Sequence, residues 1–461
     1  MATQVKTPQM SAAPVSGRAG WVEYWNPEDD AQWNSGGRRL ATRNLVFSIF
    51  AENLGFSVWL LWSTVVVFLP KAGFPFTVDE LFWLVSVPAL VGSFARLPYT
   101  FAVGKFGGRN WTVTSALLLL IPVFGLIYCV SDPGTSYLTF LVVAATAGLG
   151  GGNFASSTSN ISFFFPRRAQ GTALGLNAAG GNLGAATVQM LIPLAAVGAG
   201  GTLALADAGW IWVIPILLAA ACAYFFMNNL RVSTGNWREQ ATVARYADTW
   251  WLSLLYVGTF GSFIGYSAAF PLLIKSQFPG SSVSIAFLGA LIGSLARPIG
   301  GILGDRVGGA KITIACFLIM GVGANAVLWS LSLHNYLLFF SAFMLLFFAS
   351  GAANGSCYRM IPVLFEDRAI LAAEREGASI PGAVARGRRE AAAVIGLTSA
   401  VGALGGFLIP RGMATSIGHT GSIAFAIYVL LGFYALCLAV TVRRYVVRKS
   451  TSATAARPVL V

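Results

Sequence analysis

Residues 91–108 read VGSFARLPYTFAVGKFGG, and residues 292–309 read IGSLARPIGGILGDRVGG. The two stretches lie 201 positions apart, and this spacing superimposes Arg96 on Arg297. Nine positions after each arginine comes a basic residue, and a pair of glycines begins two positions later. Each arginine also lies within an apolar run. A shared order of residues at one spacing indicates that the chain contains an internal duplication.

Two further correspondences support the duplication. At the same spacing, Asn153 in GGGNFASS matches Asn354 in GAANGSCY. Further along, GLNAAGGNLG (175–184) matches GLTSAVGALG (396–405) at a spacing of 221. The 20 extra positions are about the size of a polar insert, 366–390, that mixes acidic residues with arginines. We predict that this insert forms a surface helix.

The composition is that of a membrane protein. Of 461 residues, 56% are hydrophobic and 10% are charged, whereas a soluble domain has about 25% charged residues. Twelve apolar segments approach or exceed the ~20 residues that cross a bilayer: 44–69, 79–104, 110–130, 136–164, 171–197, 207–228, 250–274, 281–305, 309–332, 335–364, 391–414 and 420–442. We therefore predict an all-α polytopic membrane protein with twelve transmembrane helices. A parallel repeat of two pseudo-symmetric six-helix halves is the plan of the major facilitator superfamily.

The basic residues orient the predicted helices. With the N-terminal segment in the cytoplasm, three of the 30 Lys and Arg residues fall in opposite-side loops and three lie within apolar segments, which leaves 24 in the cytoplasm. The positive-inside rule therefore places both termini in the cytoplasm. The first 40 residues contain no apolar signal-peptide core. The predicted organisation is a cytoplasmic N-terminal segment (1–43), a six-helix half (44–230), a cytoplasmic linker (231–249), a second six-helix half (250–442) and a cytoplasmic tail (443–461).

Several classes of function are disfavoured. The five cysteines are scattered through apolar segments and the two histidines fall at segment ends, so we predict no metal site and no cofactor. The net charge of +13 fits the positive-inside rule better than nucleic-acid binding. No catalytic constellation or nucleotide loop supports an enzyme, and no soluble sensory domain supports a receptor. We expect a monomer in a lipid bilayer.

Arg96 and Arg297 are the first candidates for substrate binding. Each lies nine residues before a cytoplasmic loop, which at ~1.5 Å per residue is roughly 13 Å deep. An unpaired charge at that depth is costly, and an arginine does not lose its proton. The alternatives are pairing with structural carboxylates or snorkelling to the interface, but Glu52 is the one strong intramembrane acid and cannot neutralise both. Two guanidinium forks facing one cavity suit a planar oxyanion, and an empty, more positive site would favour obligatory exchange.

Other residues can complete such a site. Asn177, in the glycine-rich fifth segment, could donate an amide hydrogen bond to an anion. Tyr256 and Phe260 lie one helical turn apart and could form an aromatic wall, although ordinary packing is the alternative in a chain with 13% aromatic residues. The sequence GILGDRVG fits a GxxxDRxG gate pattern, in which Asp305 and Arg306 can pair at the cytoplasmic side.

Glu52 has two possible roles. It lies in the first apolar segment, and an intramembrane carboxylate is a candidate proton relay. Alternatively, it is a structural carboxylate satisfied by a neighbouring helix or by Arg359. The first role would couple anion uptake to protons, whereas exchange of two monovalent anions needs no titrating group.

These motifs resemble a known family. The stretch GGGNFASSTSNISFFFPRRAQGTALGLNAAGGNLG (150–184) resembles the signature region of the nitrate/nitrite porter family of the major facilitator superfamily. TFGSFIGYSAAF, LIGSLARPIGGILGDRVGG and WNPEDDAQW add to the likeness, which runs from about residue 25 to 442. The resemblance implies alternating access in a bacterial inner membrane, with glycine-rich segments five and eleven serving the movement. It also implies that the anion is clamped by two arginines and framed by three further residues: Arg96, Arg297, Asn177, Tyr256 and Phe260.

Two residues depart from the family's antiporters. Glu52 stands where an apolar residue is expected, and Arg359 stands where an uncharged polar residue is expected. The family also includes proton–nitrate symporters. The sequence therefore predicts a secondary transporter that exchanges nitrate for nitrite, with proton-coupled nitrate symport through Glu52 as the alternative.

Overall fold

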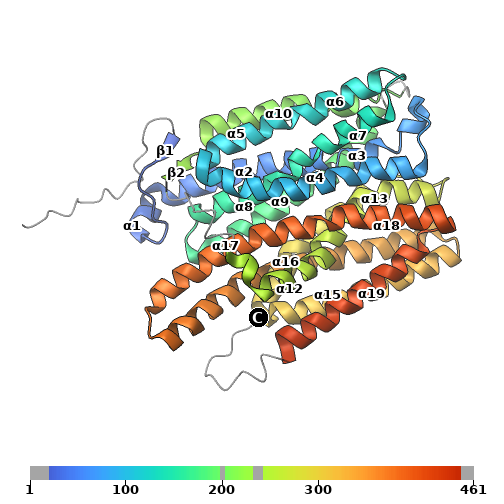
Figure 1. Ribbon diagram of the computed structural model, residues 1–461. Helices are drawn as coiled ribbons and strands as arrows, with labels where there is room; N and C mark the ends of the chain where they lie inside the picture. The colour runs from blue at the N-terminus through green and yellow to red at the C-terminus, as the bar shows by residue number, and fades with distance from the viewer. Residues whose placement is uncertain (1–19, 198–202, 232–241, 448–461) are drawn as a thin grey trace, which may run out of the picture.

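The computed structural model describes residues 20–197, 203–231 and 242–447, and these residues are almost entirely helical (Figure 1). Two short strands, β1 (Trp21–Val22) and β2 (Asn229–Leu230), pair in parallel beside the N-terminal segment. The strand pair fastens the N-terminal segment to the chain that follows the sixth membrane segment.

Helices of the N-terminal part follow the chain in this order: α1 (Asp30–Gln32), η2 (Trp33–Gly37), α2 (Arg38–Trp59), α3 (Trp62–Val65), η3 (Leu69–Ala72), α4 (Val78–Phe106), α5 (Gly108–Leu118), α6 (Leu120–Ser131), α7 (Tyr137–Thr146), α8 (Gly148–Phe164), α9 (Arg167–Ala196) and α10 (Asp207–Phe226). The C-terminal part continues with η5 (Thr242–Arg245), α12 (Ala247–Tyr256), η6 (Val257–Gly261), α13 (Ser262–Gln277), α14 (Phe287–Val307), α15 (Gly309–Ser332), α16 (Tyr336–Glu376), α17 (Ile380–Ala403), α18 (Gly405–Thr420), α19 (Ala424–Thr441) and η7 (Val442–Val447). Several predicted segments are therefore built from two or three consecutive helical pieces.

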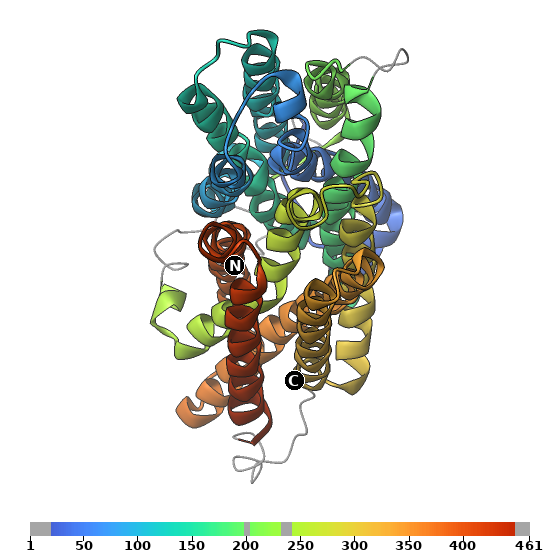
Figure 2. The same ribbon diagram turned by 90° about the vertical axis from the view of Figure 1, so that its right-hand side faces the viewer.

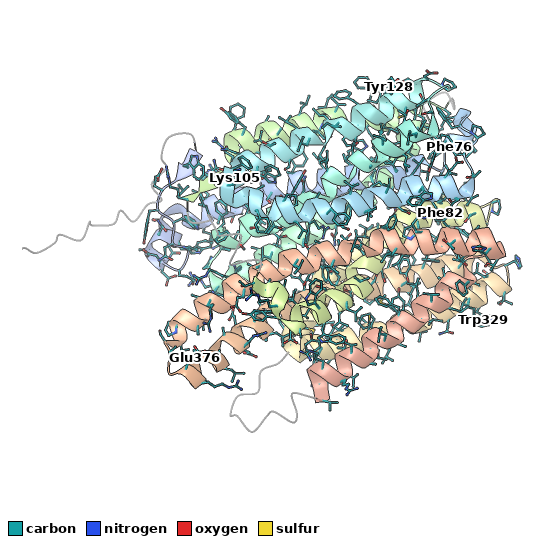
Figure 3. The ribbon with its side chains drawn as sticks, in the orientation of Figure 1. Phe76, Phe82, Lys105, Tyr128, Trp329 and Glu376 are labelled. Carbon is teal, nitrogen blue, oxygen red and sulfur yellow. The ribbon has the colours of Figure 1, made fainter. Side chains whose placement is uncertain are left out.

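Eleven stretches of the described helices are long and apolar enough to cross a membrane. The remaining predicted segment corresponds to α9, which has 30 residues but is rich in glycine, asparagine and glutamine. These residues lower the hydropathy of α9 without shortening it, and α9 is the twelfth candidate. The outer surface of the bundle is apolar: Tyr128 and Trp329, labelled in Figure 3, are 66% and 62% exposed. An apolar exterior of this kind is expected where the solvent is lipid.

The polar insert does not form a separate surface helix. Instead, α16 runs on for 41 residues to Glu376, and α17 begins at Ile380. Gly377 ends α16 in a left-handed conformation (φ 64°), and a proline opens α17. Arg388 forms an ion pair with Glu366 at 3.0 Å, which ties the two helices together beyond the bundle. The insert therefore lengthens two membrane helices into a projecting hairpin (Figure 1).

The chain folds into two groups of helices that lie side by side along a common direction. In Figures 1 and 2, the blue-to-green elements form one group and the yellow-to-red elements form the other. The groups meet where α9 packs on α14, and where α17 and α18 pack on α4. Two of the helices at these contacts, α4 and α14, carry the two arginines singled out by the sequence.

Close helix contacts depend on small residues. A Cβ atom on Gly351 of α16 would collide with the backbone of Gly293 on α14. Likewise, a Cβ on Gly405 would collide with the backbone of Gly261 in η6. Small residues at membrane helix interfaces let the backbones approach closely. These contacts position α14 and η6, which contribute residues to the candidate site.

Candidate functional site

Arg96 of α4 and Arg297 of α14 are both buried, at 0% and 3% exposure. Arg96 donates from Nε to the Gly151 carbonyl (3.0 Å) and from Nη1 to the Ser399 carbonyl (2.9 Å). Arg297 donates from Nη2 to the Tyr256 hydroxyl at 3.4 Å. Neither forms a salt bridge with any residue in the described part of the chain.

One terminal nitrogen of each guanidinium has no hydrogen-bond partner among the described residues: Nη2 of Arg96 and Nη1 of Arg297. Buried donors are almost always satisfied in folded proteins, and an exception calls for an explanation. Two permanent positive charges with spare donors can bind an anion. The sequence left two alternatives open, pairing with structural carboxylates and snorkelling to the interface. Neither arginine forms a salt bridge with a described residue, and both are buried.

A single aromatic ring lies beside both charges. The Phe154 centroid is 4.8 Å from Cζ of Arg96 and 5.2 Å from Cζ of Arg297. Arg96 also faces the ring of Phe260 at 4.9 Å, and Arg297 faces the ring of Tyr358 at 5.4 Å. A guanidinium within about 6 Å of a ring centroid is stabilised by the electrons of its face. The aromatic rings partly replace the water that the two charges have lost.

The two aromatic residues predicted from the sequence lie at this place. Tyr256 and Phe260 stack on each other, with ring centroids 5.2 Å apart and planes at 21°. Phe260 in turn stacks on Phe154 at 6.0 Å. A π-helical turn, Val257–Gly261, follows Tyr256 directly and includes Phe260, and such turns are frequent at functional sites. Gly402 leaves room for the ring of Tyr256, which a Cβ at that position would strike.

Sequence reasoning missed Phe154, Tyr358 and Trp59, although Trp59 lies 5.2 Å from Cζ of Arg96. A signal existed for two of them. Phe154 follows Asn153 directly, and Tyr358 lies in the matching stretch GAANGSCY, so both occur where the two halves of the sequence correspond. Nothing distinguishes Trp59 from the other 12 tryptophans of the chain.

Glu52 lies in a small polar cluster between three helices. Ser157 of α8 donates a short hydrogen bond to its Oε2. Asn177 of α9 donates from Nδ2 to the same oxygen (2.6 Å) and to the Ser157 hydroxyl (2.7 Å). The other carboxyl oxygen, Oε1, is buried and has no partner among the described residues. Gly181 leaves the space that this carboxyl group fills.

Asn177 was expected to donate an amide hydrogen bond to an anion. In the structure its amide nitrogen donates to Glu52 and to Ser157 instead. Side chains of the neighbouring helices α8 and α9 donate to one carboxyl oxygen of Glu52, whereas Arg359 pairs with Asp305. Glu52 forms no salt bridge with either arginine in the described part of the chain. The site therefore combines two fixed positive charges with one carboxyl group that is held apart from them.

The ion pair expected between Asp305 and Arg306 is replaced by another. Asp305 of α14 pairs with Arg359 of α16. Arg306 is exposed and forms no salt bridge with a described residue. Adjacent residues on a helix point in different directions, whereas α14 and α16 pack along their length and bring the distant arginine to Asp305.

At the opposite end of the bundle, Asp79 of α4 pairs with Arg411 of α18 at 2.9 Å. The Arg411 guanidinium also stacks over the ring of Trp83 at 4.1 Å. Of the seven salt bridges between described residues, this is the one that joins the two groups of helices. At the end that carries the N-terminal segment, every salt bridge between described residues lies within one group or the other.

No group of three or more His, Cys, Asp or Glu side chains suited to a metal ion occurs in residues 20–197, 203–231 and 242–447. The five cysteines, all of them described, are free thiols. The arrangement supplies anion-binding donors and one carboxyl group.

Comparison with known proteins gives one consistent result. The sequence profile of the Major Facilitator Superfamily matches residues 53–410. The nitrate/nitrite transporter NarU of Escherichia coli (strain K12) is 40% identical over 435 residues, which cover 90% of this chain and 94% of NarU. The probable nitrate/nitrite antiporter NarK2 of Thermus thermophilus is 37% identical over 448 residues, which cover 91% of this chain and 95% of NarK2.

Solved structures share the fold at lower sequence identity. A crystal structure of a D-xylose–proton symporter superimposes with a TM-score of 0.63 at 16% identity, covering 86% of this chain and 97% of that one. The human organic anion transporter MFSD10 superimposes with a TM-score of 0.58 at 17% identity, covering 88% and 99%. At these identities the likeness concerns the fold alone.

Proposed function

This chain belongs to the nitrate/nitrite porter family of the major facilitator superfamily, and from that premise we propose that it exchanges nitrate for nitrite across the bacterial inner membrane. The observation that carries the proposal is the pair of buried arginines, each with an unpaired terminal nitrogen, beside one shared aromatic ring. The anion binds between Arg96 and Arg297.

The chemistry of the site fits a flat monovalent anion. Nitrate and nitrite are planar and delocalised, and a guanidinium fork donates hydrogen bonds in one plane. The spare nitrogens of Arg96 and Arg297 supply the donors. Phe154, Tyr256 and Phe260 supply flat walls that exclude water. In so dry a site, each hydrogen bond from a charged donor is stronger than in water.

Charge bookkeeping favours exchange over net movement. The two arginines give the empty site two positive charges, and a bound nitrate or nitrite lowers the net charge to one. Reorienting uncompensated charge through the low-dielectric membrane is unfavourable, and the loaded site carries less of it than the empty site. The empty carrier therefore changes its accessibility slowly, and transport requires an anion in each direction.

The movement in this proposal is a rocking of two six-helix halves, 44–230 and 250–442, about the central site. Both termini and the linker 231–249, parts of which lie outside the described residues, are placed in the cytoplasm. The Asp79–Arg411 pair then closes the opposite, periplasmic end, and Asp305 and Arg306 belong to the cytoplasmic gate. In this orientation the one salt bridge between described residues that joins the two groups is periplasmic, which supports assigning the described conformation to the state closed on that side.

Proton-coupled nitrate symport is the second candidate, and a specific observation supports it. Glu52 is buried near both arginines and has one carboxyl oxygen without a partner among the described residues. Such a group can take up a proton when the anion arrives. In this scheme the proton and the anion would cross together.

Proteoliposomes separate the two schemes. Vesicles loaded with nitrite, with nitrate or with no anion are placed in labelled nitrate, first at equal pH and then with an inward proton gradient. Exchange predicts entry only into the anion-loaded vesicles. Rapid entry into empty vesicles driven by an inward proton gradient would instead establish symport, and no entry under any condition would contradict nitrate transport itself.

A further inference from the structure

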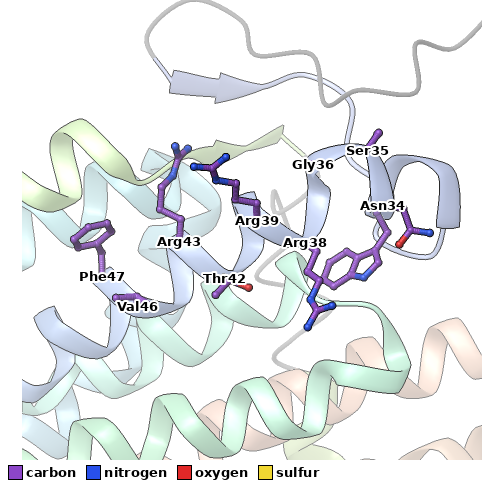
Figure 4. Close-up of a pocket in the computed structure, with 10 residues that line it drawn as sticks. Asn34, Ser35, Gly36, Arg38, Arg39, Thr42, Arg43, Val46 and Phe47 are labelled. Atoms are coloured by element: carbon purple, nitrogen blue, oxygen red, sulfur yellow. The ribbon is translucent and has the colours of Figure 1, made fainter.

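A basic groove opens on the outside of α2, at the end of the bundle that carries the N-terminal segment (Figure 4). Its volume is about 950 Å³. The groove is lined by three arginines and by apolar, small and polar residues of η2 and α2: Trp33, Asn34, Ser35, Gly36, Arg38, Arg39, Thr42, Arg43, Val46 and Phe47. The transport site does not use any of these residues.

The three arginines of the groove have no carboxylate partner among the described residues. The acidic residues of the neighbouring N-terminal segment are engaged elsewhere: Glu23 pairs with Arg231, Glu28 with Arg167 and Asp30 with Arg168. Asp29 accepts hydrogen bonds from the backbone at the start of α1. Arg39 and Arg43 thus supply two guanidinium groups that cannot lose their charge and that have no carboxylate partner among the described residues, whereas the guanidinium of Arg38 points to the other side of the helix (Figure 4).

One of the arginines is held in place. Arg43 donates from Nη2 to the side-chain oxygen of Asn228 at 2.9 Å. Asn228 is itself fixed by Asn44, which accepts a hydrogen bond from its backbone at 2.8 Å. Figure 4 shows the guanidinium groups of Arg39 and Arg43 directed to the same side of α2. An arginine already oriented by the protein loses less freedom when it binds an anion.

The groove changes from charged to apolar along the helix. Arg39, Arg43 and Phe47 are spaced four residues apart, so they line one face of α2. From Arg39 to Phe47 the helix rises roughly 12 Å, at 1.5 Å per residue. Phe47 stacks on Phe226 of α10 with ring centroids 5.1 Å apart, and the neighbouring Val46 is 53% exposed. An anionic headgroup would meet the arginines while its acyl chain follows the apolar end.

We propose that this groove binds an anionic phospholipid, with its phosphate on Arg39 and Arg43 and an acyl chain against Val46, Phe47 and Phe226. Basic pockets beside transmembrane helices are suited to such headgroups because charge and hydrocarbon are recognised together. A free phosphate ion would gain the charge contacts but leave the apolar end of the groove unused. The site is separate from the proposed anion pathway, so its test does not depend on nitrate transport.

The test uses the full-length protein in detergent, with phosphatidylglycerol, phosphatidylcholine or inorganic phosphate added. Native mass spectrometry counts bound lipid, and thermal melting reports stabilisation. We expect phosphatidylglycerol to bind and to raise the melting temperature more than phosphatidylcholine does. Arg39→Gln/Arg43→Gln should weaken phosphatidylglycerol binding by roughly thirtyfold, because each arginine contributes attraction to an anionic lipid. Phe47→Ser should weaken it through the acyl contact alone.

Two variants control for charge and for folding. Arg386→Gln/Arg389→Gln removes two exposed arginines of α17 and should leave phosphatidylglycerol binding unchanged. Arg39→Lys/Arg43→Lys keeps both charges and should retain most of the phosphatidylglycerol binding. It serves as the test in case the glutamine variant does not fold. Equal binding by the glutamine variant and the wild type would overturn the proposal. Equal stabilisation by inorganic phosphate, or by phosphatidylcholine, would overturn it as well.

Discussion

The polar cluster around Glu52 and its counterpart around Ser253 occupy corresponding places in the sequence but carry different chemistry. The spacing of 201 that relates Arg96 to Arg297 also relates Glu52 to Ser253. In the first cluster Glu52 accepts a hydrogen bond from Asn177 at 2.6 Å. In the second, Ser253 donates one to Thr398 at 3.2 Å, and the spacing of 221 relates Thr398 to Asn177.

The comparison separates two parts of the site. The arginine is present in both copies, whereas the carboxyl group is present once. A duplicated charge serves to hold the anion from two sides, and a single titratable group serves coupling or local charge balance. If the arginines bind the anion and Glu52 serves coupling, substitutions at the two kinds of residue should have different effects.

The largest effect is expected from loss of either arginine. Arg96→Gln and Arg297→Gln should each reduce nitrate affinity by at least about thirtyfold, because each removes a buried charged donor to the anion. Arg→Lys at either position should recover only part of the loss, since an ammonium lacks the planar fork. Nitrate-dependent shifts in melting temperature measure binding without transport. Arg386→Gln, on the surface of α17, is the matched control.

A difference between the two variants would itself be informative. Arg96 is held by two backbone carbonyls, whereas Arg297 is held by one hydroxyl. Loss of Arg96 should therefore lower the melting temperature of the empty protein more than loss of Arg297. Undiminished nitrate binding in either variant would show that the anion is not bound by both arginines.

Replacing Glu52, the acid that occurs in only one of the two clusters, tests whether coupling is separate from binding. Glu52→Gln preserves the size of the side chain and removes its charge. Nitrate–nitrite counterflow should persist within about threefold of wild type, because the lost interactions are hydrogen bonds of ordinary strength. Ser253→Ala, at the corresponding position, is the control. Loss of counterflow with Glu52→Gln alone would mean that exchange itself requires the carboxyl group.

The fold and the two arginines could be predicted because their signals are local. Hydropathy reveals membrane segments wherever the apolar run is unbroken, and an arginine within such a run is conspicuous. Tyr256 and Phe260 lie beside the arginines, and their contact with an anion stays a prediction. The proposal of nitrate–nitrite exchange rests on these residues together with the family resemblance.

The partners of individual polar groups could not be predicted, because helix packing decides them. Asp305 pairs with a residue 54 positions away rather than with its neighbour. Ser157, which binds Glu52, lies 105 positions from it. The projecting hairpin of α16 and α17 was missed for another reason: its residues are polar, yet they continue the helices on either side.

A smaller effect is expected from the hydroxyl group of Tyr256. Tyr256→Phe removes the one hydrogen bond that Arg297 makes to a described side chain while keeping the stacked ring. The KM for nitrate should change by about two- to tenfold, the range of a single hydrogen bond. Tyr434→Phe provides a buried control, because the Tyr434 hydroxyl bonds Ser262 and Tyr266 rather than either arginine. Equal effects of the two substitutions would assign the change to general packing.

The smallest effect is expected at the Asp79–Arg411 pair, which joins the two groups of helices at one end. Asp79 is 56% exposed and Arg411 is 18% exposed, and ion pairs of this kind contribute at most about 1 kcal/mol. Asp79→Asn should shift the protein severalfold towards the conformation open at that end, since 1.4 kcal/mol corresponds to a tenfold change. A cysteine at Phe407, which packs against Trp83, reports the opening through its rate of modification by an impermeant maleimide. Asp305→Asn breaks an ion pair within one group and should leave this rate unchanged; if both substitutions raise it equally, the pair at Asp79 is not a latch between the two groups.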